Sequence, residues 1–299
     1  MNDTGKDNNG SGNHHSDNDS IFTIIGLVNV PLMLISILVN ALVLASIKRT
    51  PSIRSTSTIF LCSLAVSDFL VGVIGQPIYI CDLLTEYSSF SQLSPVLGYS
   101  LCTVSLLTLT AISIDRLLAV HFHLRYPTLV TKSRVKFILA LIWLFSFIVS
   151  GFNHWSKSVY HLLVAPLIFI CLIISTCCYI KIYQIVRRHQ SVIQAQQRSM
   201  QSNNNEGDDV HVVELQKSVL NTFVFYIALI ICYSPAYILL TLNGVLNMKW
   251  QPEWNFATTV IFANSAVNLF LYFWRLPKLR KAVVTDIIRQ MLCKEMQEN

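Results

Sequence analysis

The chain has 299 residues, of which 53% are hydrophobic and only 13% are charged, with a mean hydropathy of +0.52. A soluble domain carries about 25% charged residues, so this composition excludes an ordinary soluble domain and indicates lipid as the main solvent. The net charge of +6 would suit nucleic acid, but the basic residues lie beside apolar stretches. We therefore expect them to meet membrane headgroups, and we expect no nucleic-acid partner.

The chain begins with a polar segment, residues 1–20, rich in Asn, Asp, Gly, Ser and His. We expect this segment to be a disordered extracellular tail and not a cleavable signal peptide, which needs a basic end and then an apolar run. Three acceptor sequons make Asn2, Asn9 and Asn18 candidate glycosylation sites.

Apolar stretches long enough to cross a membrane follow almost to the end of the chain. About 20 helical residues cross about 30 Å of hydrocarbon, and lipid requires helices because it cannot satisfy backbone polar groups. The expected fold is an all-α membrane protein, a seven-transmembrane helix bundle over residues 21–275. Its predicted spans are residues 21–47, 57–82, 91–120, 134–154, 160–186, 214–242 and 254–275.

The connecting segments set the expected orientation. Lys and Arg gather in the first, third and fifth connections and after the last span, which places the N-terminus outside and the C-terminus in the cytosol of a plasma-membrane protein. We expect residues 188–213 to form a flexible cytosolic loop. Residues 276–299 are expected to form a short amphipathic eighth helix and a short cytosolic tail, with Cys293 as a candidate palmitoylation site or an unmodified thiol.

Asp68 is the only acidic or basic side chain well inside a predicted span. A charge at that depth costs at least about 2.5–3.5 kcal/mol, which favours a functional role over a protonated, hydrogen-bonded carboxyl group. Oxygen ligands around a carboxylate suit a hard cation. Polar partners are available on other spans, namely Asn40, Ser105, Asn264, Ser265 and Asn268.

Two further features stand at informative places in the spans. Asp115 and Arg116 lie at the expected cytosolic boundary of the third span, where an ordinary pair reaching toward headgroups is the simplest interpretation. Pro77, Pro166 and Pro235 lie inside the second, fifth and sixth spans, where each removes a helical hydrogen bond and favours a kink.

Taken together and in order, these residues resemble the rhodopsin-like receptor family over roughly residues 21–293. Three motif positions depart from the family pattern: Leu117 stands for its tyrosine, Tyr233 for its tryptophan and Leu269 for its proline. The matching residues are Asn40, Asp68, Asp115 with Arg116, Trp143, Pro166, Cys232 to Pro235, and Asn268 to Tyr272.

The resemblance implies roles for the matched residues. Asp68, with Ser105, Asn264, Asn268 and the neighbouring Asn40, would form a sodium site of the resting state. Arg116 would be held by Asp115 at rest and released toward the G protein. Pro235 would be the hinge of the sixth helix, and Tyr272 would swing inward. Sodium would be an allosteric ion, and no other cofactor is expected.

The resemblance also narrows the branch of the family. The usual disulfide is missing, because Ser91 stands at its third-span position and residues 144–165 contain no cysteine. Melanocortin-type receptors share this lack, and Leu124-Arg125-Tyr126 is similar to adenosine receptors. Gly98 stands where amine receptors keep an aspartate, and Phe262 where opsins keep a lysine, so neither class is expected.

The function expected from this resemblance is a cell-surface receptor for an unidentified extracellular ligand that activates heterotrimeric G proteins. Arrestin is expected as a further partner, recruited by phosphorylation of Ser191, Ser199 and Ser202. The ligand pocket, or else plain helix packing, is expected at Tyr79, Tyr99, Cys102, Tyr233, Tyr237, Trp254 and Thr258.

Three alternatives remain open. A seven-helix transporter or proton pump usually needs several buried ionisable groups. An intramembrane enzyme needs paired acids, a metal-ligand cluster or an activated nucleophile, none of which is evident, so we expect no enzyme. The altered residues Leu117, Tyr233 and Leu269 leave a non-signalling relative as the third.

Overall fold

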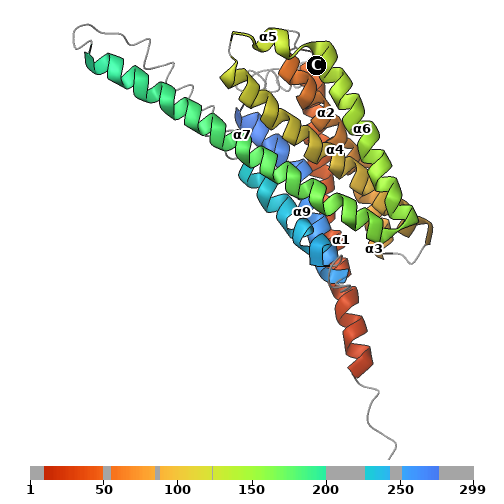
Figure 1. Cartoon of the computed structure of the whole chain (residues 1–299). Coiled ribbons are helices and arrows are strands. Elements are labelled where there is room, and N and C mark those ends of the chain that lie inside the picture. The colour runs from red at the N-terminus through yellow and green to blue at the C-terminus, as the bar shows by residue number, and fades with distance from the viewer. Residues whose placement is uncertain are drawn as a thin grey trace, which may run out of the picture.

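The structure is a computed structural model that describes residues 10–49, 55–84, 88–122, 124–199, 226–242 and 251–275. Every regular element in these ranges is helical, and the helices pack side by side as a bundle (Figure 1). The elements are α1 (Gly10–Arg49), α2 (Thr56–Leu70), the π-helical turn η2 (Val71–Gly75), α3 (Gln76–Leu84), α4 (Ser88–His121), α5 (Tyr126–Leu129), α6 (Lys132–Trp155), α7 (Lys157–Ser199), a helix over Tyr226–Leu242 and α9 (Gln251–Arg275).

The predicted membrane bundle is confirmed. The helix over Tyr226–Leu242 is apolar but shorter in its described part, and α9 has 25 residues. Residues 214–225, Cys293 and the whole of the predicted eighth helix lie outside the described residues. Five helical segments are long and apolar enough to cross a membrane, namely Ser20–Arg49, Thr56–Leu84, Val96–His121, Lys132–Trp155 and Lys157–Arg188.

Two helices extend into segments that we expected to lack structure. α1 already begins at Gly10, within the expected tail, and α7 continues to Ser199, within the expected loop. Once a helix has formed, each further residue adds one hydrogen bond at little cost, so a stable span lengthens readily. Asn2 and Asn9 lie outside the described residues, and Asn18 is described in its backbone only.

The second span contains a feature that the sequence did not predict, the π-helical turn η2 between α2 and α3. Pro77 follows this turn and has no N–H to donate, and such a loss favours a local change of helical pitch. The turn contains Gly72, and a Cβ atom there would lie 2.8 Å from Ile37 Cγ1 and 3.2 Å from the Met33 carbonyl oxygen of α1. The glycine thus permits a close approach of the second span to α1.

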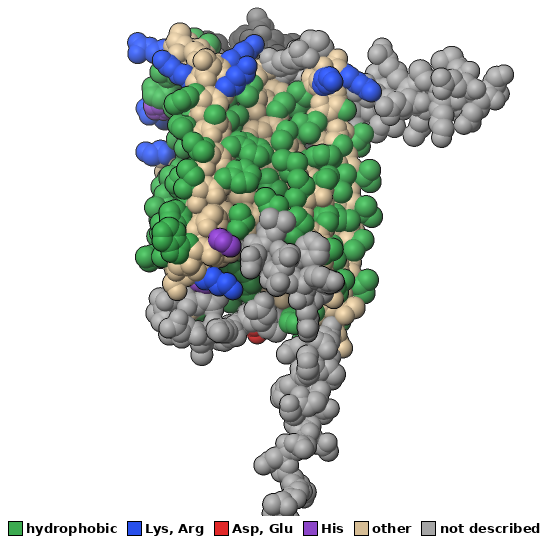
Figure 2. All heavy atoms as spheres, turned by 90° about the vertical axis from the view of Figure 1, so that its right-hand side faces the viewer, with side chains coloured by type: hydrophobic (Ala, Val, Ile, Leu, Met, Phe, Trp, Pro, Cys, Tyr) green, Lys and Arg blue, Asp and Glu red, His purple; other side chains and the backbone are tan. Residues whose placement is uncertain are grey.

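The side chains are distributed as expected for a protein dissolved in lipid. Figure 2 shows a band of apolar side chains along the bundle, and most of the Lys and Arg on this face gather at one end. Large apolar residues such as Leu38 and Phe137 are exposed, whereas Asn29, Ser67 and Asp68 are fully buried. Polar groups therefore turn inward, because lipid offers them no hydrogen bonds.

The two ends of the bundle differ in charge. We call the basic end the one where α1 ends at Lys48 and Arg49 and where α6 begins at Lys132. At the opposite end, Ser156 alone connects α6 to α7. No disulfide is found in the part of the chain that the structure describes.

We predict that the Gly72→Ala substitution destabilises the bundle by about 1–3 kcal/mol, because the added methyl group overpacks the contact with Ile37. Gly151→Ala is the matched control, since a Cβ atom at Gly151 meets nothing within 4 Å. Thermal unfolding of the two purified variants in detergent measures the difference. Equal melting temperatures would contradict the close approach of η2 to α1.

Candidate functional site

The carboxylate of Asp68 lies fully buried at the centre of the bundle and accepts three hydrogen bonds. Ser105 Oγ of α4 donates to Asp68 Oδ1 over 3.0 Å, and Ser265 Oγ of α9 donates to the same oxygen over 2.9 Å. Asn268 Nδ2 of α9 donates to Asp68 Oδ2 over 3.1 Å. The network therefore ties α2 to two helices that are distant in sequence.

The remaining predicted members of this site do not touch the carboxylate. Asn40 donates to the carbonyl oxygens of Ser36 over 2.8 Å and Ser265 over 3.3 Å, while Ser36 Oγ donates to the Asp68 carbonyl oxygen over 2.9 Å. Asn40 thus supports the backbone around the site from α1. Asn264 is buried, and neither of its side-chain polar atoms has a partner among the described residues.

The residues around Asp68 fit a small, hard cation. The carboxylate and the hydroxyl oxygens of Ser105 and Ser265 converge, and hard cations prefer such oxygen ligands. The buried, unpartnered Oδ1 of Asn264 is a further oxygen in α9 next to Ser265. From the sequence, Ser265 was named only as an available polar partner of Asp68. Its direct hydrogen bond to Asp68 depends on the rotation of α9 about its own axis relative to α2.

A second polar cluster lies at the basic end, around Asp115 of α4. Arg116 Nη2 lies 3.2 Å from Asp115 Oδ2, and Ser57 Oγ of α2 donates to the same oxygen over 2.9 Å. Tyr126 Oη of α5 donates to Asp115 Oδ1 over 2.6 Å. Asp115 is buried, whereas the Arg116 side chain is about one-third exposed and its Nε has no partner among the described residues.

From the sequence, Tyr126 and Leu124 were named only within the motif similar to adenosine receptors, and neither was given a role at this end. Burial and the hydrogen bond to Asp115 raise the pKa of the Tyr126 phenol above its usual value, so the phenol remains a donor. Leu124 is 90% exposed in the connection between α4 and α5, outside the apolar band. It is far more exposed than Phe122 and Leu129 on either side of it, which are 40% and 41% exposed, and this difference cannot be read from the sequence.

Four of the seven predicted pocket residues line one cavity, and its volume is only about 30 Å³. Trp254 Nε1 donates to Tyr99 Oη over 2.8 Å, and the two rings form an edge-to-face pair. Tyr233 Oη donates to the Cys102 carbonyl oxygen over 3.1 Å. Tyr160 of α7, which sequence reasoning did not name, stacks on Tyr99 and also lines the cavity.

The other three predicted pocket residues lie outside this cavity. Tyr79 packs against Phe262 and donates to the Asn255 carbonyl oxygen over 3.1 Å. Tyr237 stacks on Phe169, and Thr258 Oγ1 donates to the Trp254 carbonyl oxygen. For these three residues the structure shows helix packing.

Phe262 also lies against the position where amine receptors keep their aspartate. A Cβ atom at Gly98 would meet the Phe262 ring at 3.7 Å. This is an ordinary van der Waals distance, so the Phe262 ring packs directly beside Gly98.

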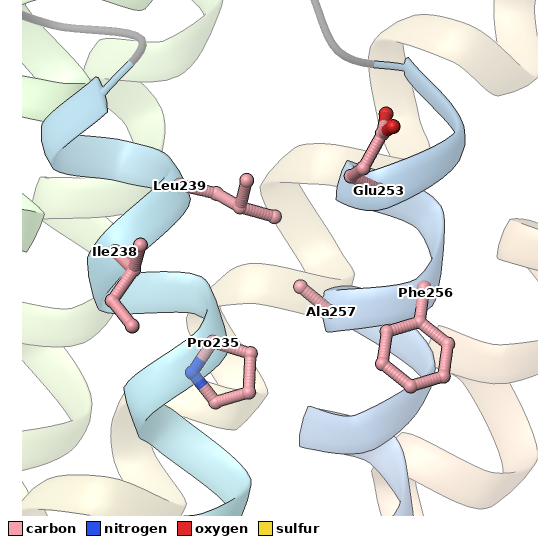
Figure 3. A pocket seen from close by; sticks show the side chains of 6 residues that line it. All are labelled: Pro235, Ile238, Leu239, Glu253, Phe256 and Ala257. Carbon is pink, nitrogen blue, oxygen red and sulfur yellow. The ribbon is translucent and has the colours of Figure 1, made fainter.

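Pro235 lines a different cavity of about 440 Å³, between the helix over Tyr226–Leu242 and α9. Figure 3 shows Leu239 of the first helix and Ala257 of α9 pointing toward one another across it. Phe256, which also lines the cavity, is 61% exposed. Beside Pro235 the two helices therefore leave an open groove between them. The side chain of Tyr272 is not among those described.

Comparison with known proteins agrees with this geometry. Residues 39–155 match the model of the 7 transmembrane receptor (rhodopsin family). Melanocortin receptor 4 of Danio rerio is 25% identical over 279 residues, which are 87% of this chain and 81% of that receptor. Adenosine receptor A2b of Gallus gallus is 25% identical over 310 residues, or 88% of this chain and 87% of that receptor.

A shorter match has higher identity. Octopamine receptor 1 of Lymnaea stagnalis is 33% identical over 122 residues, which are 40% of this chain but only 19% of that receptor. Two relatives that match along most of the chain are thus a melanocortin and an adenosine receptor, the branch that the sequence motifs indicated. The chain is thus similar to the rhodopsin-like family of seven-transmembrane receptors, and along most of its length to a melanocortin and an adenosine receptor.

Proposed function

We propose that this chain is a cell-surface receptor that binds an extracellular ligand and activates heterotrimeric G proteins. The observation that carries the proposal is the state of Arg116 at the basic end. Its guanidinium is held by Asp115, which Tyr126 and Ser57 hold in turn. A fixed positive charge restrained in this way can be released when α4 and its neighbours move, so the cluster suits a two-state switch.

The proposal includes an orientation. Basic residues beside spans favour the cytosol, so the basic end would face the cytosol and the end with Trp254 would face outward. Arg116 would then meet the G protein. Arrestin would be a further partner, recruited through phosphorylation of Ser191, Ser199 and Ser202. Ser191 is exposed in α7, whose long helix is seen in Figure 1.

The ligand would enter beside Tyr99, Tyr160 and Trp254. In this structure Trp254 and Tyr99 are hydrogen-bonded to each other and both line a cavity of only about 30 Å³, so a ligand would have to displace side chains there. Pro235 would act as the hinge of its helix, and the open groove between this helix and α9 supports that role. Octopamine, melanocortin and adenosine receptors are the named relatives, so amines, melanocortin-type peptides and nucleosides are the first ligands to test.

Sodium binding at Asp68 is part of the same proposal. Ser105, Ser265 and the carboxylate would supply oxygen ligands, and the ion would cross-link α2, α4 and α9. A ligand that binds only one arrangement of these helices favours that arrangement. Sodium would therefore favour the arrangement described here.

The first prediction concerns coupling. Membranes that contain the wild-type chain should stimulate nucleotide exchange on added G proteins in the presence of a pool of amines, nucleosides and melanocortin-type peptides. Arg116→Ala should abolish this stimulation at unchanged surface expression, whereas Lys157→Ala at the opposite end should not. If Arg116→Ala stimulated nucleotide exchange as strongly as the wild type, Asp115 and Arg116 would be only an ion pair at the membrane boundary. If the wild type stimulated no exchange with any of these ligands, the chain would be a non-signalling relative.

The second prediction concerns the exposed Leu124. Truncation of a side chain that docks in a partner commonly costs more than about 1 kcal/mol, or about fivefold in affinity. Leu124→Ala should therefore weaken G-protein coupling by about fivefold or more without changing ligand affinity. Leu129→Ala, in the adjoining α5, is the control, because Leu129 is only 41% exposed. An equal loss in both variants would argue against a specific contact at Leu124.

The third prediction concerns sodium. Replacing choline chloride by sodium chloride should raise the melting temperature of the purified wild-type protein, because a bound ion stabilises the folded state. Asp68→Asn should remove this sodium dependence, whereas Glu253→Gln, at an exposed carboxylate of α9, should retain it. The sodium site would be refuted by a wild-type protein that melts at the same temperature in both salts.

A further inference from the structure

The groove beside Pro235 differs from the small central cavity in its lining and in its direction. It has a volume of about 440 Å³, and no described residue lines both of them. Phe256 and Ile238 are 61% and 53% exposed, so the groove opens on the outer surface of the bundle, where lipid lies. Each helix contributes residues at i, i+3 and i+4, which share one helix face. They are Pro235, Ile238 and Leu239 of the helix over Tyr226–Leu242, and Glu253, Phe256 and Ala257 of α9.

Glu253 is the only charged residue among the described residues of this lining. Its carboxylate is exposed, and it makes no ion pair or hydrogen bond with another residue that the structure describes. Figure 3 shows this carboxylate at one end of the groove and the Pro235 ring toward the other, with Leu239 and Ala257 between them. Glu253 lies in the first turn of α9, where the helix dipole stabilises a negative charge. The groove therefore has an anion at its mouth and an apolar length beyond it.

From this arrangement we propose that the groove binds a cationic amphiphile from the membrane, an ammonium group on a single hydrocarbon chain. The ammonium would lie beside the Glu253 carboxylate at the level of the headgroups, and the chain would follow Leu239, Ala257 and Pro235 into the bilayer. An alkylamine is charged at neutral pH, as lysine is. The volume falls within the range of about 300–1,000 Å³ that ligand pockets have.

The charge of Glu253 selects among membrane molecules. Lipid tails already cover the apolar surface of the bundle, so an uncharged chain gains little from entering the groove. A phospholipid would bring its phosphate toward the carboxylate, which repels it, and a sterol would leave the carboxylate without a counter-charge. An ammonium group on a chain supplies an opposite charge directly above an apolar body. The proposal does not rest on the signalling function, since it needs only a membrane around the bundle.

The test uses the purified full-length protein in a neutral detergent at neutral pH. Hexadecylamine and hexadecan-1-ol have the same chain, and native mass spectrometry counts the molecules of each that remain bound during a titration. The wild type should bind the amine about fivefold more tightly than the alcohol, which is the upper range for an ion pair at an exposed site. Glu253→Gln should remove this preference and bind both compounds equally. Asp82→Asn, at an acid of α3 outside the groove, is the matched control and should keep the preference.

A second pair of variants tests the apolar length and leaves Glu253 in place. Leu239→Trp should fill the groove and weaken the binding of both compounds. Ile231→Trp, at a 60% exposed position of the same helix outside the groove, should bind them as the wild type does. This pair keeps the proposal testable if Glu253→Gln fails to fold.

Three results would overturn the proposal. The first is equal affinity of the wild type for the amine and the alcohol. The second is a preference for the amine that survives in Glu253→Gln or is lost equally in Asp82→Asn, because the cation would then bind elsewhere or be attracted to the whole end of the bundle. The third is unchanged binding in Leu239→Trp, which would place the chain outside the groove.

Discussion

The buried carboxylate of Asp68 is the constraint on which the rest of the bundle depends. A charged or strongly polar group in lipid is costly unless other polar groups surround it. Ser105, Ser265 and Asn268 supply these groups from α4 and α9, and they can do so only if both helices turn their polar faces toward α2. One side chain thus sets the rotation of two neighbouring helices.

This requirement also explains why α9, unlike five other helical segments, contains no described stretch that is apolar enough to be recognised as a membrane span by composition. Its polar side chains, including Asn255, Thr259 and Asn264, are buried against the other helices, and Asn29 Nδ2 of α1 donates to Thr259 Oγ1 over 2.9 Å. Lipid meets mostly its other face, which includes Phe256. Composition alone would rank such a helix as a poor membrane span. In the packed bundle, however, its polar side chains form hydrogen bonds that hold the helices together.

The two polar clusters are connected through α4. Ser105 contacts Asp68 in the middle of that helix, and Asp115 and Arg116 lie nearly three turns further on at the basic end. Between them, Ser113 Oγ donates to Tyr179 Oη of α7 over 3.0 Å. A rigid helix that bears both clusters offers a physical route by which an ion or ligand in the centre could bias the arginine at the end. Tyr233, in the helix over Tyr226–Leu242, donates a hydrogen bond to the Cys102 carbonyl oxygen of α4. The family pattern has a tryptophan at the position of Tyr233.

The sequence by itself determined that lipid is the main solvent of the protein, how many spans the chain has, and that Asp68 is the acid buried among them. Lipid solvation depends on the length and polarity of local segments, and Asp68 stands out because no other charge lies deep in a span. Contacts between distant residues depend instead on helix rotation and close approach, which local patterns do not encode. The tertiary structure therefore decided that Ser265 contacts Asp68, whereas the side chain of Asn264 has no partner among the described residues. It also decided that Tyr126 donates a hydrogen bond to Asp115, and that α1 packs closely against the second span at Gly72. It also separated Tyr79, Tyr237 and Thr258 from the central cavity, because an aromatic or polar residue of a membrane helix can face a cavity or a neighbouring helix, and only packing selects between them.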